Sequence, residues 1–360
     1  MSLAQPKRIL IIKLRHHGDV LLSTPVVDAL KTRFPDCEID MLVYAGTEQL
    51  IADNPQIAQI FTIDRNWKKL GVFKQLACEK NLFSKLKARD YDWAFNLSDQ
   101  WRAAIIAKLC ARCSVGLDCI KRDGFWWRFC HDFINHELDP SHHIVENQLN
   151  ILAPLIQPED VADAKVRLWV AQDARESMRQ KLREQGWNGE DYVLMHPGAR
   201  WHFKCWEDGK NAAIVQLLLN SGQNVVLTAS PDNVEQYMLQ EIIGRLNIPE
   251  GGKVWVLSGC LSLRELAAAI EGAKLFIGVD SAPMHIAAAL DKPQIALFGA
   301  SWVDKWRPYS EQAEVIYAGD YAELPNPDSI DNNDPTRLLK AIPLQDVWDR
   351  ISAKLEALEA

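Results

Sequence analysis

The sequence predicts an α/β protein of two doubly wound domains, each a parallel sheet covered by helices on both faces. Short apolar runs that do not alternate with polar residues recur along the chain with helical segments between them, which is typical of buried parallel strands. The series restarts after a polar stretch, residues 157–165 (QPEDVADAK). A chain of 360 residues is also long enough for two domains of ordinary size. We therefore expect two Rossmann-like domains that face a cleft.

Ten strands are expected, five in each half. Those of the first half are residues 8–14, 38–44, 59–63, 92–97 and 113–117; those of the second are 192–196, 225–229, 254–257, 275–279 and 295–299. Helical segments fill the intervals, among them residues 19–34 and a helix over 142–155 that ends at Pro154. The expected domains are residues 1–165 and 166–345, followed by a helix over 346–360 that packs back across the junction.

Composition indicates a soluble protein that stays in the cytoplasm. No apolar run approaches the length that spans a bilayer, and Met1 to Arg8 lead into a strand instead of a signal-peptide core. The eight cysteines are spaced irregularly and predict no disulfide framework. One group of side chains raises the question of a zinc site, but no second paired motif follows it, so we favour buried thiols there: Cys110, Cys113, Cys119, Cys130 and His131.

Charge is distributed unevenly along the chain. The net charge is −8, yet residues 65–128 carry 14 Lys and Arg against 6 Asp and Glu, together with five tryptophans. Lysine and arginine pair with phosphate and tryptophan stacks on sugar faces, so this stretch suits a phosphorylated, sugar-bearing ligand. A solvated helix face with core tryptophans is the alternative interpretation.

The first candidate functional segment, Arg15 to Asp19 (RHHGD), follows the first strand. Ligands of doubly wound sheets bind at the carboxyl ends of the strands. Gly18 allows a tight turn and Asp19 falls at a helix N-terminus, where its carboxylate stays ionised and can accept a proton from a sugar hydroxyl. Helix capping alone also explains an aspartate at this position.

Two further strand ends combine small residues with charged ones. His196-Pro197-Gly198 ends the first strand of the second half, with Lys204 shortly after it, where a glycine and a lysine can meet a phosphate. A tight turn with a surface lysine is the alternative. The third segment, residues 278–285 (GVDSAPMH), leads into a helix whose N-terminal N–H groups can hold a phosphate, although a capping box explains part of it.

Several familiar fingerprints are missing from the sequence. There is no Walker A motif and no G-x-G-x-x-G after the first strand, which argues against nucleotide hydrolysis and standard NAD binding. Asp90 and Asp92 resemble the metal-holding pair of some glycosyltransferases, but they fall at the start of a strand, away from the carboxyl ends. We do not expect them to bind a metal.

Three long segments resemble the bacterial lipopolysaccharide heptosyltransferases, glycosyltransferase family 9 with the GT-B fold. They are RILIIKLRHHGDVLLSTPVVDALK, VLMHPGARWHFKCW and LSGCLSLRELAAAIEGAKLFIGVDSAPMHIAAALDKPQIALFG. Within the family the chain is most similar to the enzymes that add a branch heptose to the inner core. The resemblance implies inverting transfer of heptose from ADP-heptose without a metal or other cofactor.

The resemblance also implies roles for individual residues. Asp19 matches the catalytic base, Lys204 a lysine on the donor phosphates, and Asp232, more loosely, an acidic ribose contact. The complete donor set is His196, Pro197, Gly198, Lys204, Asp232, Asp280, Ser281, Ala282 and His285. For the acceptor we expect His16, His17, Lys68, Lys69, Trp101 and Arg122.

Two positions depart from the family pattern. Ala282 stands where the family more often has glycine, and its Cβ restricts how closely the backbone approaches a phosphate. His16 and His17 stand where serines are more common, and we expect them to form local hydrogen bonds.

The expected partners are ADP-heptose and a phosphorylated lipopolysaccharide core at the inner face of the inner membrane, with no nucleic acid. Two alternatives remain from the residues alone. One is a nucleotide-sugar epimerase of the same architecture; the other is a relative that binds nucleotide or glycan without catalysis.

Overall fold

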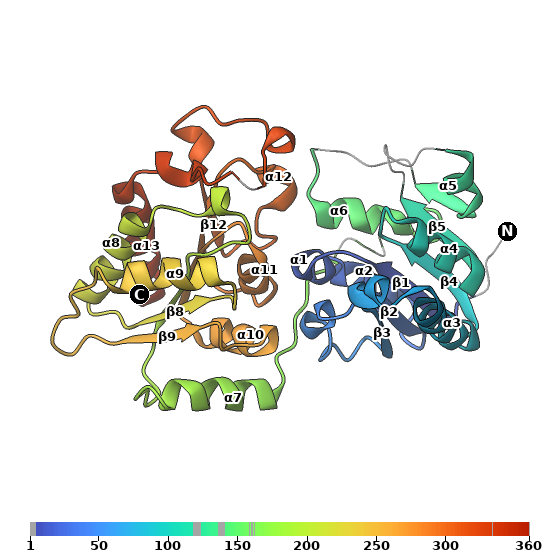
Figure 1. The fold of residues 1–360 in the computed structure, drawn as a ribbon, viewed down its shortest axis with the longest axis horizontal. Helices are drawn as coiled ribbons and strands as arrows, with labels where there is room; N and C mark the ends of the chain where they lie inside the picture. Colours follow the sequence, from blue (N-terminus) through green and yellow to red (C-terminus); the bar gives the residue numbers. More distant parts are fainter. Residues whose placement is uncertain are drawn as a thin grey trace. The chain divides into compact units, whose positions relative to one another are not determined.

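A computed structural model describes residues 5–117, 124–135, 141–157, 159, 161, 163–332 and 334–359. The chain divides into two compact units, Met1–Trp169 (unit 1) and Val170–Ala360 (unit 2) (Figure 1). The observed division thus falls four residues after the boundary expected at residue 165. Among the described residues, no helix has the length and apolar character needed to cross a membrane.

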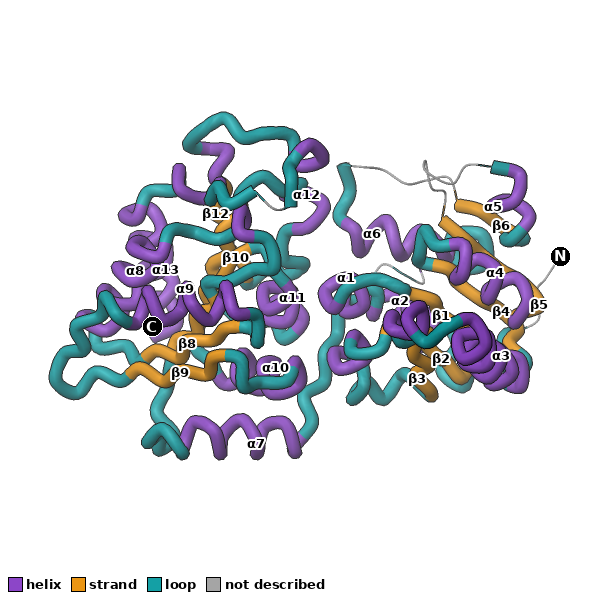
Figure 2. The backbone as a smooth tube through the Cα atoms, in the orientation of Figure 1, coloured by secondary structure: helices purple, strands orange, loops and turns teal. Residues whose placement is uncertain are grey.

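Unit 1 is built on a parallel six-stranded sheet in the order β3-β2-β1-β4-β5-β6 (Figure 2). Its strands are β1 (Arg8–Lys13), β2 (Glu38–Tyr44), β3 (Gln59–Ile63), β4 (Tyr91–Asn96), β5 (Ala111–Leu117) and β6 (Phe133–Asn135). The five expected strands are confirmed. The three-residue edge strand β6 lacks the apolar run that marks the others.

Unit 2 repeats this design in the order β12-β11-β10-β7-β8-β9. Its strands are β7 (Val193–His196), β8 (Val225–Ala229), β9 (Val254–Ser258), β10 (Leu275–Val279), β11 (Gln294–Phe298) and β12 (Ala313–Tyr317). The sequence analysis missed β12, because this edge strand is only partly buried and carries a charged residue. The doubly wound parallel class is confirmed in both units.

Helices cover the two sheets. Those of unit 1 are α1 (His17–Leu21), α2 (Thr24–Arg33), α3 (Val72–Ala88), α4 (Trp101–Cys110), α5 (Phe125–Phe129) and α6 (Ile144–Leu149), with the short 3-10 turns η2 (Arg65–Lys69) and η4 (Asn150–Leu152). Those of unit 2 are α7 (Gln172–Arg183), α8 (Asp208–Asn220), α9 (Asn233–Ile243), α10 (Leu263–Gly272), α11 (Ala282–Ala289), α12 (Val303–Trp306) and α13 (Leu344–Glu359), with the 3-10 turn η6 (His202–Lys204).

The helix expected over residues 19–34 is two helices, α1 and α2, because Pro25 has no N–H to give to the carbonyl of Leu21. The hydroxyl of Thr24 donates to that carbonyl at 2.8 Å, and the hydroxyl of Ser23 donates to the carbonyl of Val20 at 2.7 Å. These two hydroxyls satisfy backbone groups that the break would otherwise leave unpaired. The segment expected as a helix over 142–155 is likewise α6 followed by η4.

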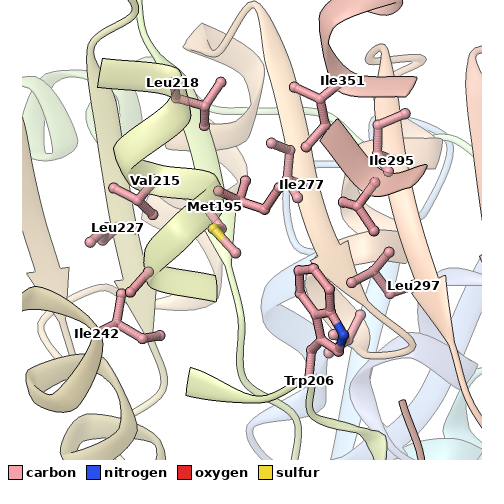
Figure 3. Close-up of a cluster of buried hydrophobic side chains, with 14 of the residues drawn as sticks. Met195, Trp206, Val215, Leu218, Leu227, Ile242, Ile277, Ile295, Leu297 and Ile351 are labelled. Atoms are coloured by element: carbon pink, nitrogen blue, oxygen red, sulfur yellow. The ribbon is translucent and has the colours of Figure 1, made fainter. Parts of the chain in front are cut away.

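Each unit has its own hydrophobic core. That of unit 2 is drawn in Figure 3, where side chains from the strands, such as Ile277 and Leu297, meet Leu218 of α8 and Ile351 of α13. The helix expected at residues 346–360 is α13, and its buried Val347, Ile351 and Leu355 belong to this core. In unit 1, β1 is almost wholly buried between β2 and β4.

Strand order decides where a ligand site can form. In unit 1 the chain proceeds outward from β1 to β2 and β3, and then returns to β4 on the other side of β1. In unit 2 it proceeds from β7 to β8 and β9, and returns to β10 on the other side of β7. The loops that follow β1 and β4, and those that follow β7 and β10, therefore diverge from neighbouring strands and leave a crevice at the carboxyl edge.

Acid stability gives a test of the packing of α7 on α10. Glu265 accepts hydrogen bonds from the N–H of Ser262 at 2.7 Å, from Ser177 at 2.6 Å and from Lys181 at 2.5 Å. Burial raises the pKa of Glu265, but these hydrogen bonds outweigh it and lower the pKa to about 2. Because the pKa of Glu265 is lower in the folded protein than the ordinary value of 4.5, the ionised carboxylate stabilises the fold at pH values above 4.5. This stabilisation is lost as the pH falls towards 2.

We therefore expect Glu265→Gln to lower the free energy of unfolding by about 1–3 kcal/mol at pH 7, and by progressively less between pH 4.5 and about 2. Urea unfolding followed by circular dichroism at a series of pH values measures this difference. The control is Glu241→Gln, which removes an exposed pair with Arg245. A difference that does not change with pH would contradict the assignment.

Candidate functional site

The loop after β1 in unit 1 is held by the loop after β4. The N–H of Leu14 donates to the hydroxyl of Ser98 at 2.7 Å, and the side-chain amide of Gln100 donates to the carbonyl of Leu14 at 2.8 Å. Arg15 pairs with Asp99 at 3.0 Å. These contacts between the loops after two neighbouring strands give the loop after β1 a defined conformation.

Asp19 is the third residue of α1, not the N-cap residue that the sequence analysis considered; His16 occupies that position. The carboxylate of Asp19 accepts from the backbone N–H of His16 at 3.4 Å. The side chain is half-buried at the carboxyl edge of the sheet. One weak capping bond leaves carboxylate lone pairs for another partner, so capping and proton transfer are compatible.

The other residues expected on the acceptor side fall in three places. His16 and His17 adjoin Asp19, whereas Lys68 and Lys69 are exposed on η2. Trp101 begins α4, and its ring lies 5.6 Å from that of Trp127. Arg122 lies outside the described residues.

The sequence analysis gave no role to two arginines near Asp19, Arg15 of the first candidate segment and Arg65. Arg65, the first residue of η2, donates to the carbonyl of Arg15 at 3.3 Å and lies 4.2 Å from the centre of the Tyr44 ring. This contact brings η2, and with it the lysines of that turn, to the loop after β1. Both arginines were visible in the sequence, Arg15 beside the RHHGD turn and Arg65 in the basic stretch, but their contacts depend on tertiary structure.

In unit 2, His196 ends β7 and is buried with Glu235 of α9. Its Nδ1 lies 2.8 Å from the hydroxyl of Thr228, and its Nε2 lies 3.6 Å from the Glu235 carboxylate. Burial raises the pKa of Glu235, but His196 and the N–H and hydroxyl of Ser230 lower it by more, so the pKa lies below its ordinary value. Glu235 is therefore a buried carboxylate that stays ionised beside the Pro197-Gly198 turn.

Lys204 and Asp280 are 76 residues apart in the sequence and form an ion pair of 2.5 Å. Asp280 follows β10 and is 7% exposed; it also accepts from the hydroxyl of Ser301 at 2.6 Å. Lys204 ends η6 and its ammonium lies 5.1 Å from the centre of the Trp201 ring. The structure thus brings together the two donor-side segments predicted to hold a phosphate.

The helix that follows Asp280 is α11, with Ser281 at its N-cap position. Ala282 is the first helical residue, so its Cβ is compatible with the local backbone. Its effect on the approach of a phosphate stays a prediction. Pro283 occupies a position where a missing N–H costs nothing. His285 is buried in the first turns of the helix, 6% exposed.

The turn that carries Lys204 is anchored by Arg337. The guanidinium donates to His202 at 2.9 Å and to both carboxylate oxygens of Asp208, at 2.5 and 3.0 Å. Burial and the neighbouring Arg337 lower the pKa of His202, which keeps its ring neutral and able to accept that bond. Arg337, Asp208 and Ser301 support the site without any sequence signal that places them there.

A pocket of about 240 Å³ lies beside this region in unit 2. Its walls come from the residues after β7, including Ala199 and Arg200, and from the start of α9, including Val234 and Met238. Asp232 caps α9 by accepting from the N–H of Val234 at 2.9 Å, and it lines the same pocket. The pocket combines apolar walls with carboxylates, a combination suited to a base and a sugar diol.

The groups considered for metal binding have other partners. Cys110 and Cys113 are buried, and burial raises the pKa of Cys110 to about 11, while Cys119 lies outside the described residues. The ring of His131 contacts the amide of Asn96 and the carbonyl of Trp127. Arg112 pairs with both Asp90 and Asp92. Within the part of the chain that the structure describes, no three His, Cys, Asp or Glu side chains form a metal-binding group.

Comparisons with known proteins agree on one family. Residues 80–336 match the model of glycosyltransferase family 9 (heptosyltransferase). The chain is 38% identical to lipopolysaccharide heptosyltransferase 3 of Escherichia coli, over 93% of this chain and 95% of that protein.

Solved structures of the same fold include a family 9 glycosyl transferase from Veillonella parvula, with a TM-score of 0.83 and 21% identity over 99% of each chain. They also include the ADP-heptose lipopolysaccharide heptosyltransferase II of E. coli, with a TM-score of 0.77 and 22% identity over 98% of this chain and 100% of that one. The expected GT-B fold is confirmed.

The close approach at Gly198 can be tested by substitution. A Cβ at this position would lie 2.6 Å from the carboxylate of Glu235. We expect Gly198→Ala to displace that buried side chain and to lower the free energy of unfolding by about 1–3 kcal/mol. The control is Gly209→Ala in α8, where the nearest atom is 4.0 Å away. Urea unfolding measures both variants, and equal stabilities would contradict the tight packing.

Proposed function

Because the chain belongs to glycosyltransferase family 9, the heptosyltransferases, we propose that it transfers heptose from ADP-heptose to a heptose of the lipopolysaccharide inner core, inverting the anomeric carbon, with Asp19 as the general base. Membership of the family makes the chain a glycosyltransferase and sets aside the epimerase and the non-catalytic binder. The Lys204–Asp280 pair at the N-terminus of α11 is the observation that carries the proposal.

The donor is proposed to bind in unit 2. The N-terminus of α11 offers backbone N–H groups and the positive end of a helix dipole, and Lys204 adds a full positive charge to the same place. The nucleoside then occupies the adjoining 240 Å³ pocket, where the Asp232 carboxylate can accept from a ribose hydroxyl. The E. coli relative of the same fold uses ADP-heptose, as its name states.

Lys204 has to take a second partner when the donor binds. In the structure its ammonium is bound to Asp280, which Ser301 also contacts. A pyrophosphate brings negative charge close to Asp280, and the three donors of an ammonium allow Lys204 to bind both anions. These groups can take up the charge that develops on the leaving ADP, so the proposed mechanism needs no metal.

The acceptor is proposed to bind in unit 1. Four basic side chains lie around the loop after β1: Arg15, Arg65, Lys68 and Lys69. Their positive charge suits a phosphorylated sugar core. The acceptor hydroxyl gives its proton to Asp19, and its oxygen bonds to the anomeric carbon on the face opposite ADP. As this bond forms, the bond from that carbon to the phosphate oxygen breaks, and its electron pair leaves with ADP.

We place this reaction in the cytoplasm, at the inner face of the membrane that carries the acceptor. The cysteines of the described residues are free thiols, as a reducing compartment requires. Like heptosyltransferase 3 of E. coli, which the chain resembles over nearly its whole length, the enzyme is proposed to add a branch heptose.

The first test is release of ADP from ADP-heptose, in the presence of EDTA, with lipopolysaccharide cores truncated after one, two or three heptoses. We expect release only with the two-heptose core. Asp19→Asn keeps an oxygen for the N–H of His16 but loses the base, so the rate should fall by about 10²–10⁴-fold while ADP affinity stays within about twofold.

The matched control is Asp36→Asn, an exposed aspartate at the opposite edge of the sheet, which should leave the rate unchanged. Transfer by Asp19→Asn within tenfold of the unmodified enzyme would reduce Asp19 to a helix cap. Release that stops in EDTA and returns with a divalent cation would overturn the proposed metal independence.

The role of Lys204 is separable from that of Asp280 by a pair of variants. We expect Lys204→Ala to weaken ADP binding by about 10–100-fold, measured by calorimetry, because a phosphate contact is lost and Asp280 keeps an unneutralised charge. Lys274→Ala, at the opposite end of β10, is the control. If Lys204 contacts the phosphates, the double variant Lys204→Ala/Asp280→Asn should still bind ADP weakly. Recovery of full ADP affinity would mean that Lys204 only neutralises Asp280.

A further inference from the structure

The outward face of α4 is apolar. Trp101, Ile105 and Leu109 recur every fourth residue and are 37%, 46% and 55% exposed, while the opposite face of the helix is buried in unit 1. A stripe of large apolar side chains along one side of a helix is normally covered by another part of the protein. In α4 this outer stripe is in contact with solvent.

The neighbouring helix α3 extends this surface. Its first turns carry Phe73 and Leu76, which are 89% and 60% exposed. A groove of about 530 Å³ lies between α3 and α4. It is lined mostly by apolar side chains, such as Leu76, Phe83 and Ile105. Apolar surface therefore continues from one helix to the next.

A cluster of aromatic rings on α5 completes the surface. Phe125, Trp126 and Phe129 are 74%, 68% and 61% exposed, and their ring centres lie 5.5 to 6.4 Å apart. Between them in sequence, Trp127 is buried and packs edge-on against Trp101 of α4. The buried tryptophan holds α5 in place while its neighbours point outward.

The three helices form one face of unit 1, the α3–α5 face. They follow β3, β4 and β5 in turn, so they cover the same side of the sheet (Figure 1). Among the described residues of unit 1, every exposed large hydrophobic side chain lies in residues 70–76, 101–109 or 125–133. In unit 2 such side chains are fewer and more widely spaced: Val234 and Tyr237 on α9, Ile248, Trp302 and Leu358. A patch of this kind marks an interaction surface.

The charges around the α3–α5 face are mainly positive. Lys74, Lys80, Lys85 and Lys87 are exposed along α3. The single acidic residue of that helix, Glu79, pairs with Arg102 of α4 at 2.6 Å. Exposed lysines around apolar and aromatic side chains complement a surface that is apolar within and anionic outside.

We propose that the α3–α5 face binds an anionic phospholipid bilayer, with its aromatic and aliphatic side chains among the headgroups and its lysines on the lipid phosphates. Tryptophan and phenylalanine at this exposure are typical of protein at a membrane interface. A second copy of the chain fits less well, because two such faces would bring their lysines together and like charges repel.

This face adjoins the proposed acceptor site. The N-termini of α3, α4 and α5 follow the carboxyl ends of their strands, which is the edge of the sheet where Asp19 lies. A bilayer at this face would present a lipid-anchored acceptor near that edge. This consequence rests on the proposed function, whereas the binding itself does not.

The experiment is co-sedimentation of the full chain with vesicles, without donor or acceptor. Vesicles of phosphatidylcholine with one third phosphatidylglycerol are compared with phosphatidylcholine alone. We expect binding to the anionic vesicles that weakens with salt, and at least tenfold weaker binding by Phe73→Ser/Leu76→Ser/Trp126→Ser. Lys74→Gln/Lys80→Gln should lose about fivefold per lysine.

The matched control is Tyr237→Ser/Ile248→Ser/Leu358→Ser, which removes exposed apolar side chains from unit 2 and should bind as the unmodified chain does. Transfer to a lipid-free core oligosaccharide is measured in parallel and should be unaffected by the serine substitutions on α3 and α5. Failure of that assay concerns the proposed function alone. No vesicle binding, equal binding by all variants, or a dimer that the α3 and α5 substitutions dissociate would each overturn the proposal.

Discussion

The order of the parallel strands is the constraint on which both candidate sites depend. Because β1 lies between β2 and β4, and β7 between β8 and β10, the loops after these strands leave the sheet in divergent directions. That geometry brings Ser98 and Gln100 to Leu14 in unit 1 and Asp280 to Lys204 in unit 2. Contacts across 76 or more residues are therefore consequences of strand pairing.

Much of this arrangement followed from local sequence patterns. Continuous apolar runs identified ten of the twelve strands, and the glycine-containing or charged turns after them identified Asp19, Lys204 and Asp280. The edge strands β6 and β12 were not predicted, because they are short or half-exposed and lack a continuous apolar run. Three supporting residues were not predicted for another reason, because their contacts depend on tertiary packing that no spacing in the sequence encodes. These contacts are Ser301 with Asp280, Glu235 with His196, and Arg337 with His202.

The apolar surface of unit 1 was hidden for a related reason. Hydrophobic periodicity reports which residues of a helix are apolar, but it does not report whether another element covers them. The sequence analysis made no prediction for Ile105 and Leu109, which are 46% and 55% exposed in the structure. The basic stretch that contains α3 and α4 was expected to suit a phosphorylated ligand or to form a solvated helix face. Its described lysines lie on η2 near Asp19, along the exposed side of α3 and, in the case of Lys108, on α4.

The departures from the family pattern fall differently on the two units. Ala282 replaces a glycine at the donor side, yet it begins α11 with helical geometry, so the N–H groups of that helix keep their direction. His16 and His17 replace serines in unit 1, where His16 caps α1 and its N–H binds Asp19. An imidazole beside the proposed base is larger than a hydroxyl. The backbone of α11 thus accommodates Ala282, and we expect the two histidines to act at the loop after β1.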